Sequence, residues 1–181
     1  MYKSLAYLTA ALILCTAGAS AFDGNRRGFA LGAGLGYAPV TVFDDNSANI
    51  SEQDDAMAQL TLIGWGIDSR NVISFGGVWS GYNPERQDIS GIEQGLVGLT
   101  WDHYFDSTAP SWFAGLMIGR FWSNVRHVQE ERYGLGVSLS AGYEPVRHLR
   151  VGLYLYGSRT SDRGSSVYHG VLSVIVSATA F

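Results

Sequence analysis

The sequence predicts an all-β protein, an eight-stranded antiparallel up-and-down transmembrane β-barrel. Three observations predict this fold. Large apolar side chains alternate with small ones at a period of two, short and long connections alternate along the chain, and charged residues are nearly confined to the connections. Successive side chains of a strand point to opposite faces, so a period of two indicates strands and not helices.

The start of the 181-residue chain predicts a cleaved signal peptide over 1–21. Lys3 supplies a positive charge, residues 5–14 form a short apolar run, and residues 19–21 are the small side chains that precede a cleavage site. The expected mature domain, over 22–181, is the barrel.

The mature composition excludes several classes of protein. Loss of Lys3 changes the formal net charge from −4 to −5, and a mildly acidic chain gives no support to nucleic-acid binding. No run of 18 apolar residues follows the leader, which excludes a membrane-spanning helix. The single cysteine, Cys15, lies in the leader, so disulfides and thiolate metal sites are excluded from the mature chain. No motif predicts a cofactor.

Eight segments are predicted as strands, each about as long as the 9–11 residues of a tilted membrane strand or slightly longer. The segment 133–143 is the clearest, because one face carries Tyr, Leu, Val and Ala while the other carries only Gly and Ser. In 56–67 and 111–122 apolar residues occur at both parities, so the faces of these two strands stay open. The remaining segments are 28–38, 70–82, 91–105, 149–158 and 167–181.

The connections between these segments fall into two classes. The short ones contain Asp, Ser and Pro, which are common turn formers, and lie at 68–70, 106–110 and 144–148. The longer ones lie at 39–55, 83–90, 123–132 and 159–166. Short turns at one end and longer loops at the other are typical of an outer-membrane barrel.

The distribution of charge predicts which face of each strand meets lipid. The mature chain has 27 charged side chains, 16 acidic residues and 11 arginines. Apart from Arg70, where the turn 68–70 meets the strand 70–82, only four lie within the predicted strands: Glu93, Asp102, Arg120 and Arg150. A soluble barrel, the alternative, needs polar side chains on its outer face. Gly and Ser fit a narrow interior, so the Leu and Val side is predicted to contact lipid.

All five tryptophans lie near the ends of predicted strands. Amphipathic rings favour the membrane–water interface, so we expect two girdles of interface aromatics. The alternative is that these rings fill a core. The tryptophans are Trp65, Trp79, Trp101, Trp112 and Trp122.

The chain ends within an apolar run, VLSVIVSATAF, whose last residue is Phe181. A closed barrel requires this, because its last strand pairs with its first and leaves no backbone unpaired in lipid. Together with the leader, the eight segments and the unequal connections, this ending resembles the small eight-stranded outer-membrane barrels of the OmpA/OmpX-like family over 22–181. The resemblance implies that Phe181 is a signal read by the barrel-assembly machinery. Thr179 departs from the family pattern, which usually has a second aromatic there.

Two members of this architectural class are lipid-modifying enzymes, so the four histidines are candidates for a catalytic site. His103 and His148 are predicted at the end with short connections, and His127 and His169 at the other end. The lipid A deacylases carry a His-x-Ser pair, whereas His169 is followed by Gly and Val, and Ser173 is about 13 Å away at strand rise. No catalytic residue is assigned, and a lipid A deacylase or acyltransferase remains an alternative.

Two groups of charged residues are candidates for other roles. The acidic connection 39–55 lacks the spacing of a calcium loop, so no metal site is assigned, although divalent cations bridging it to lipopolysaccharide are an alternative. Guanidinium groups pair with lipid phosphates. The candidate lipopolysaccharide contacts are Arg126, Arg132, Arg159 and Arg163.

Four charged residues are predicted to form a network inside the barrel: Asp102, Arg120, Glu144 and Arg150. Glu144 and Arg150 flank a tight turn on one face and are predicted to pair. Eight strands enclose too little lumen for a sizeable channel, because side chains fill it. A narrow conduit for small solutes remains an alternative.

The sequence therefore predicts an integral outer-membrane protein of a Gram-negative bacterium. Its predicted role is structural or surface interaction: membrane integrity, adhesion, or contact with external molecules through four longer loops. The expected partners are outer-membrane lipid and lipopolysaccharide, the barrel-assembly machinery, and an extracellular ligand that the sequence does not identify.

Overall fold

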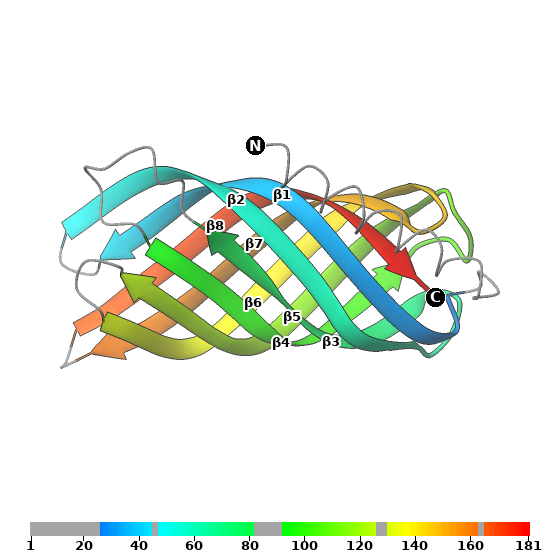
Figure 1. Cartoon of the computed structure of the whole chain (residues 1–181), viewed down its shortest axis with the longest axis horizontal. Helices are drawn as coiled ribbons and strands as arrows, with labels where there is room; N and C mark the ends of the chain where they lie inside the picture. The colour runs from blue at the N-terminus through cyan, green and yellow to red at the C-terminus, as the bar shows by residue number, and fades with distance from the viewer. Residues whose placement is uncertain (1–25, 45–46, 82–91, 126–129, 163–164) are drawn as a thin grey trace, which may run out of the picture.

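The computed structural model describes residues 26–44, 47–81, 92–125, 130–162 and 165–181. Eight antiparallel strands in these residues close into one barrel in sequence order (Figure 1). This confirms the predicted fold. The strands are β1 (Gly28–Asp44), β2 (Ser47–Gly66), β3 (Asn71–Gly81), β4 (Ile92–Tyr104), β5 (Ser111–Val125), β6 (Glu130–Val146), β7 (Leu149–Asp162) and β8 (Ser165–Ala180).

The last strand closes the barrel against the first. β8 pairs with β1 from Leu31↔Ala180 to Asp44↔Val167, so the ladder runs almost to the final residue, Phe181. In lipid an open edge leaves backbone donors and acceptors without partners. The structure thus bears out the explanation of the apolar chain ending. No helix in the described residues has the length and hydropathy needed to cross a membrane.

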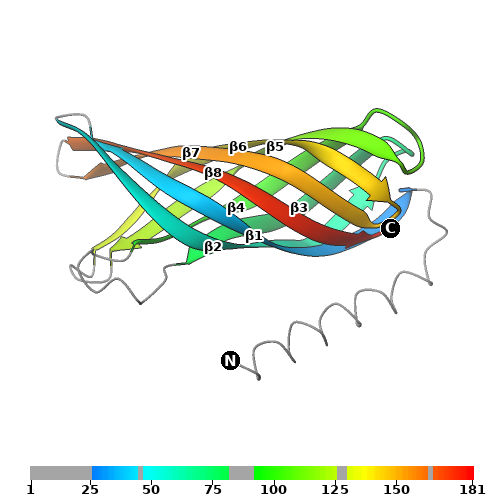
Figure 2. The same ribbon diagram turned by 90° about the horizontal axis from the view of Figure 1, so that it is seen from above.

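The short connections 67–70, 105–110 and 147–148 lie at the end of the barrel that also holds the C-terminus, here called the turn end (Figures 1 and 2). In the first of them the Asp68 carboxylate accepts hydrogen bonds from the Asn71 side chain at 2.9 Å and from the backbone N–H of Arg70 at 2.7 Å. These hydrogen bonds stabilise the charged carboxylate and hold the pKa of Asp68 below its usual value, and the bond from the Asn71 side chain has the largest effect. Asp68 is therefore a turn former, as aspartate commonly is.

At the opposite end, here called the loop end, the strands extend further than predicted. The predicted connection 39–55 is mostly strand, since β1 and β2 pair as far as Asp44↔Ser47. β5, β6, β7 and β8 likewise extend into the predicted connections 123–132 and 159–166. Apolar and small side chains alternate only along the part of each strand that contacts lipid. Beyond it the strands continue to pair through polar residues, so the sequence pattern predicts strands that are too short.

A bulge in β2 explains why the faces of 56–67 could not be assigned. Between Ala30↔Gly64 and Gly32↔Thr61 one residue of β1, Leu31, opposes two residues of β2. An extra residue interrupts the alternation, so the neighbours Leu62 and Ile63 are both exposed. Before the bulge the inward side chains are odd-numbered, and after it they are even-numbered.

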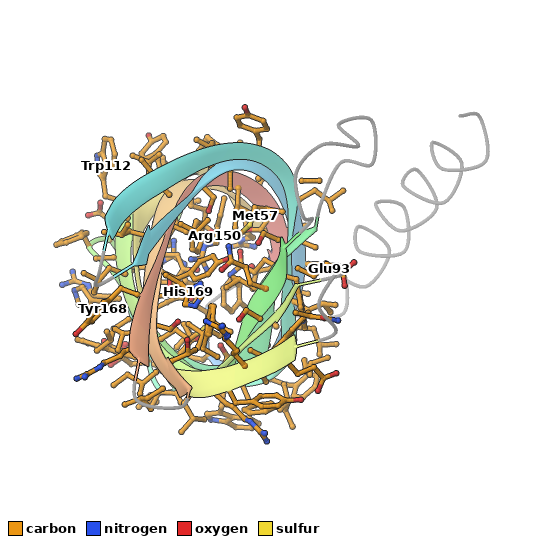
Figure 3. The ribbon with its side chains drawn as sticks, turned by 90° about the vertical axis from the view of Figure 1, so that its left-hand side faces the viewer. Met57, Glu93, Trp112, Arg150, Tyr168 and His169 are labelled. Atoms are coloured by element: carbon orange, nitrogen blue, oxygen red, sulfur yellow. The ribbon has the colours of Figure 1, made fainter. Side chains whose placement is uncertain are left out.

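In β6 and β7, where the alternation is strict, the Leu and Val side faces outward, as predicted. In β6 Leu135 and Leu139 are 70% and 55% exposed, whereas Ser138 is 4% exposed. Figure 3 shows the same division along the barrel axis: Met57, Arg150 and His169 point inward, and Trp112, Tyr168 and Glu93 project outward. A largely apolar exterior of this kind is what a membrane barrel requires.

Candidate functional site

A cluster of buried side chains closes the turn end of the barrel, and we call it the turn-end plug. It combines two ion pairs with three aromatic rings. Its members are Arg26, Asp102, Tyr104, Phe113, Glu144, Arg150 and Phe181.

Arg26 is bonded to residues beside all three short connections. Its Nε donates to Glu144 Oε2 at 3.1 Å, and its Nη1 donates to the carbonyl oxygens of Ser69 at 3.2 Å and Asp106 at 2.7 Å. Glu144 also accepts from the backbone N–H of His148 at 3.2 Å. One side chain therefore cross-links segments that are far apart in the sequence.

The second ion pair lies beside the first. Arg150 Nη1 donates to Asp102 Oδ2 at 2.9 Å, and both side chains are buried. The Arg150 guanidinium also lies 3.9 Å from the centre of the Phe113 ring, and that of Arg26 lies 3.9 Å from the centre of the Tyr104 ring. Buried charges persist when they are paired in this way, because an unpaired charge in a low-dielectric interior is costly.

The predicted interior network therefore needs two corrections. Glu144 pairs with Arg26 and Arg150 pairs with Asp102, so the predicted pair of Glu144 with Arg150 is wrong. Arg120 does not point inward. It is exposed on the outer face of β5, because the inward positions of that strand are the odd-numbered residues, such as Phe121.

Above the turn-end plug, toward the loop end, apolar side chains fill the barrel. We call these residues the inner apolar cluster. Tyr156 crosses the lumen, since its hydroxyl donates to Ser80 Oγ at 3.1 Å. The cluster consists of Ala38, Met57, Val78, Leu96, Met117, Phe121, Tyr154, Tyr156, Val171 and Ile175.

A small cavity remains within the filled interior. It has a volume of about 20 Å³ and is lined by polar groups that include Gln59, Asp102 and Ser138. That volume is close to the space that one water molecule requires. The described part of the interior is thus filled by side chains, as a small barrel should be.

His169 lies inside the barrel toward the loop end. It is buried, its Nε2 is 3.2 Å from Thr160 Oγ1, and its ring centre is 5.1 Å from that of Phe121. Among the described residues, neither a serine nor a carboxylate hydrogen-bonds to it, and Ser173 Oγ instead donates to the carbonyl oxygen of Tyr154. This histidine and threonine form a pair with no orienting acid, so the described residues do not assemble a catalytic triad. His127 lies outside the described residues.

The other two histidines lie at the turn end. His103 Nδ1 is 3.0 Å from Asn71 Oδ1, and its ring lies between those of Trp101 and Phe105. His148 Nδ1 is 2.8 Å from the carbonyl oxygen of Thr179. These contacts are structural. No group of three or more His, Cys, Asp or Glu in the described ranges is arranged to hold a metal ion.

The four arginines named as lipopolysaccharide contacts do not form one described patch. Arg159 is exposed on the outer face of β7, 5.6 Å from the Tyr168 ring. Arg132 is half-buried on the inward side of β6. Arg126 and Arg163 lie outside the described residues.

The five tryptophans all lie on the outer face of the barrel. Trp65, Trp101 and Trp112 are exposed near the turn end. Trp79 and Trp122 are half-buried and lie toward the other ends of β3 and β5. The rings therefore stand in two bands, which is the arrangement expected of interface aromatics.

Tyr104 and Arg26 belong to the turn-end plug but were not predicted to lie inside the barrel. Tyr104 shares the inward parity of Asp102, so the alternation of β4 held a signal for it. Arg26 precedes the first strand, and no sequence pattern indicates that its side chain packs into the turn end of the barrel.

The closed ladder, the apolar exterior and the filled interior define the class of protein: a small transmembrane β-barrel of eight strands. Two solved structures share the fold. Neisserial surface protein A is 15% identical, with 83% of this chain and 96% of that chain covered and a TM-score of 0.51. Ail, the attachment invasion locus protein of Yersinia pestis, is 13% identical, with 84% and 99% covered and a TM-score of 0.52. The resemblance to small eight-stranded outer-membrane barrels is thus confirmed for the fold. No protein-family model and no curated protein sequence matches the chain.

Proposed function

We propose that this protein is an integral outer-membrane barrel with a structural or surface-interaction role, exported through the signal peptide over 1–21. The observation that carries the proposal is an apolar exterior around an interior that the turn-end plug and the inner apolar cluster fill. An interior filled in this way leaves the lipid-facing wall and the loop end as the surfaces available for function.

The alternatives have less support. A conduit needs a continuous wet lumen, whereas the described cavity has a volume of about 20 Å³. An enzyme needs an oriented nucleophile and base, whereas His169 contacts a threonine and a phenylalanine. Surface interaction has a precedent in the same fold, since Ail is named for attachment and invasion.

Orientation in the membrane is tested by cysteine labelling. The mature chain has no cysteine, so single variants report one position each. Arg159→Cys lies toward the loop end, and Arg70→Cys is a matched exposed arginine at the turn end. A bulky polyethylene-glycol maleimide should label Arg159→Cys on intact cells and Arg70→Cys only after the outer membrane is opened. Equal labelling of both on intact cells, or of neither after opening, contradicts the proposal.

The role is tested by expression in a Gram-negative strain that lacks the protein. We expect the protein to change resistance to detergent or adhesion to host cells while the mass spectrum of lipid A stays the same. A new lipid A mass that depends on His169 would favour the enzyme, and stable single-channel steps in planar bilayers would favour the conduit.

A further inference from the structure

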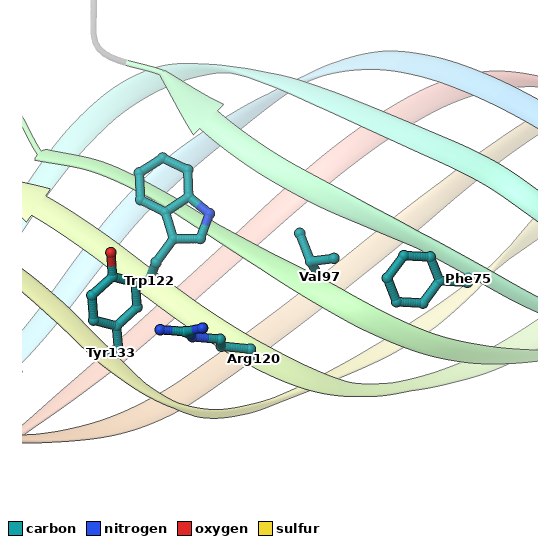
Figure 4. Close-up of a pocket in the computed structure, with 5 residues that line it drawn as sticks. All are labelled: Phe75, Val97, Arg120, Trp122 and Tyr133. Atoms are coloured by element: carbon teal, nitrogen blue, oxygen red, sulfur yellow. The ribbon is translucent and has the colours of Figure 1, made fainter.

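A groove with a volume of about 450 Å³ lies on the outer wall of the barrel across β3 to β6 (Figure 4). This volume falls within the range of about 300–1,000 Å³ that small-ligand sites have. Its lining is apolar or aromatic with one exception, a guanidinium group. The lining residues are Phe75, Val97, Arg120, Trp122 and Tyr133.

A glycine allows the wall of the groove to form. The Cβ of any other residue at Gly95 would lie 2.7 Å from Trp122 Nε1 and 2.8 Å from Trp79 Cδ1. Both indoles therefore lie directly against the β4 backbone at this point. Trp122 and Val97 both line the groove.

Arg120 is an unusual residue for its position. Trp112 and Trp122 are ten residues apart on the outer face of β5, which is a full membrane span. Arg120 lies on the same face two residues inside Trp122, about 7 Å along the strand. At the tilt of such strands, about 35–45°, this places it roughly 5 Å inside the outer aromatic band.

Although the Glu131 carboxylate accepts a hydrogen bond from the Tyr133 hydroxyl at 2.6 Å, no carboxylate of the described residues forms an ion pair with Arg120. Its guanidinium lies 4.3 Å from the centre of the Tyr133 ring, and Figure 4 shows it extended toward Tyr133 and Trp122. A cation–π contact stabilises the cation but does not neutralise it. A cation facing lipid is unfavourable, so this position favours an anionic group at the edge of the hydrocarbon.

We propose that this groove binds one phosphorylated glycolipid of the lipid A class, with its phosphate on Arg120 and an acyl chain along Phe75 and Val97. Guanidinium groups bind phosphate through two parallel hydrogen bonds. The groove lies toward the loop end, so the lipid comes from the outer leaflet, and this assignment rests on the proposed function. This site does not include the earlier candidates Arg132 and Arg159, which do not line the groove.

The experiment separates the charge from the shape of the groove. Arg120→Gln removes the charge, and Arg70→Gln is its charge-matched control at the turn end. Val97→Trp fills the groove and keeps Arg120, and Val151→Trp is its control on the outer face of β7. Protein refolded without lipid is mixed with lipid A in detergent and analysed by native mass spectrometry, and the shifted band of unheated samples on gels verifies folding.

We expect the wild type and both controls to carry one lipid A per barrel. Arg120→Gln and Val97→Trp should each reduce that fraction at least fivefold, and phosphatidylglycerol should not compete at equal concentration. Unchanged lipid A in folded Arg120→Gln or Val97→Trp, an equal loss in the controls, or equal binding of phosphatidylglycerol overturns the proposal. Cysteine labelling on cells tests the proposed function separately, so the two failures are distinguishable.

Discussion

The strongest prediction concerns the buried ion pair of Arg150 and Asp102. In Arg150→Met the apolar side chain still packs against Phe113, but Asp102 keeps a buried charge with no partner. Removing one partner of a buried pair costs about 3–5 kcal/mol, chiefly because the other charge stays desolvated. With a urea slope of about 2 kcal/mol/M, the unfolding midpoint should fall by about 2 M.

The assay is equilibrium unfolding by urea in phospholipid vesicles, followed by tryptophan fluorescence and by the mobility of unheated samples on gels. The isosteric Asp102→Asn supplies the second corner of a double-mutant cycle. The double variant should lose about 2–3 kcal/mol less than the sum of the single losses, since contacting residues couple on that scale. Arg159→Met, at an exposed position, is the control and should change the free energy of unfolding by less than about 0.5 kcal/mol.

Two results would refute this reasoning. One is a loss below about 1 kcal/mol in Arg150→Met, which would mean that water or another group already solvates Asp102. The other is simple additivity in the cycle, which would mean that the two residues stabilise the barrel independently.

Three further predictions concern other parts of the barrel. Phe181→Ala should cost about 3–5 kcal/mol, because a buried ring that packs edge-on against Tyr104 would leave a cavity, and urea unfolding measures it. Tyr156→Phe should cost about 1 kcal/mol in the same assay through loss of the bond to Ser80, and no change would show that water replaces the hydroxyl. The lowered pKa of Asp68 means that its contribution to stability is present above the usual aspartate pKa of about 3.9 and is lost as pH falls through the lowered value. Asp68→Asn should therefore be less stable than the wild type at neutral pH, with a difference that shrinks in acid, and an equal difference at both pH values would contradict this.

The sequence was most informative where alternation was strict. In β6 leucines and valine alternate with glycine and serine, and the sides were assigned correctly because lipid and a narrow lumen select opposite side chains. In β5 both sides are apolar, since Phe113, Met117 and Phe121 fill the interior while Trp112 and Ile118 face outward. Arg120 was misplaced for this reason.

The partners of the interior charges were not predictable from local spacing. Glu144 and Arg150 are near in sequence, but the turn between them directs each to a partner across the barrel. Pairs separated by 48 and 118 residues depend on the closed geometry of the cylinder. Strand parity identifies which charges are buried, and only the closed fold determines which ones meet.

The contacts of Arg26 have a consequence for the order of folding. They join Arg26 to Ser69, Asp106 and Glu144, at sequence separations of 43, 80 and 118 residues. Contacts this remote close large loops, so they form late, after the hairpins that they connect. An interaction made after the transition state slows unfolding and leaves the folding rate nearly unchanged. The contacts of Arg26 therefore affect the unfolding rate, and so the lifetime of the folded barrel, and leave its rate of assembly nearly unchanged.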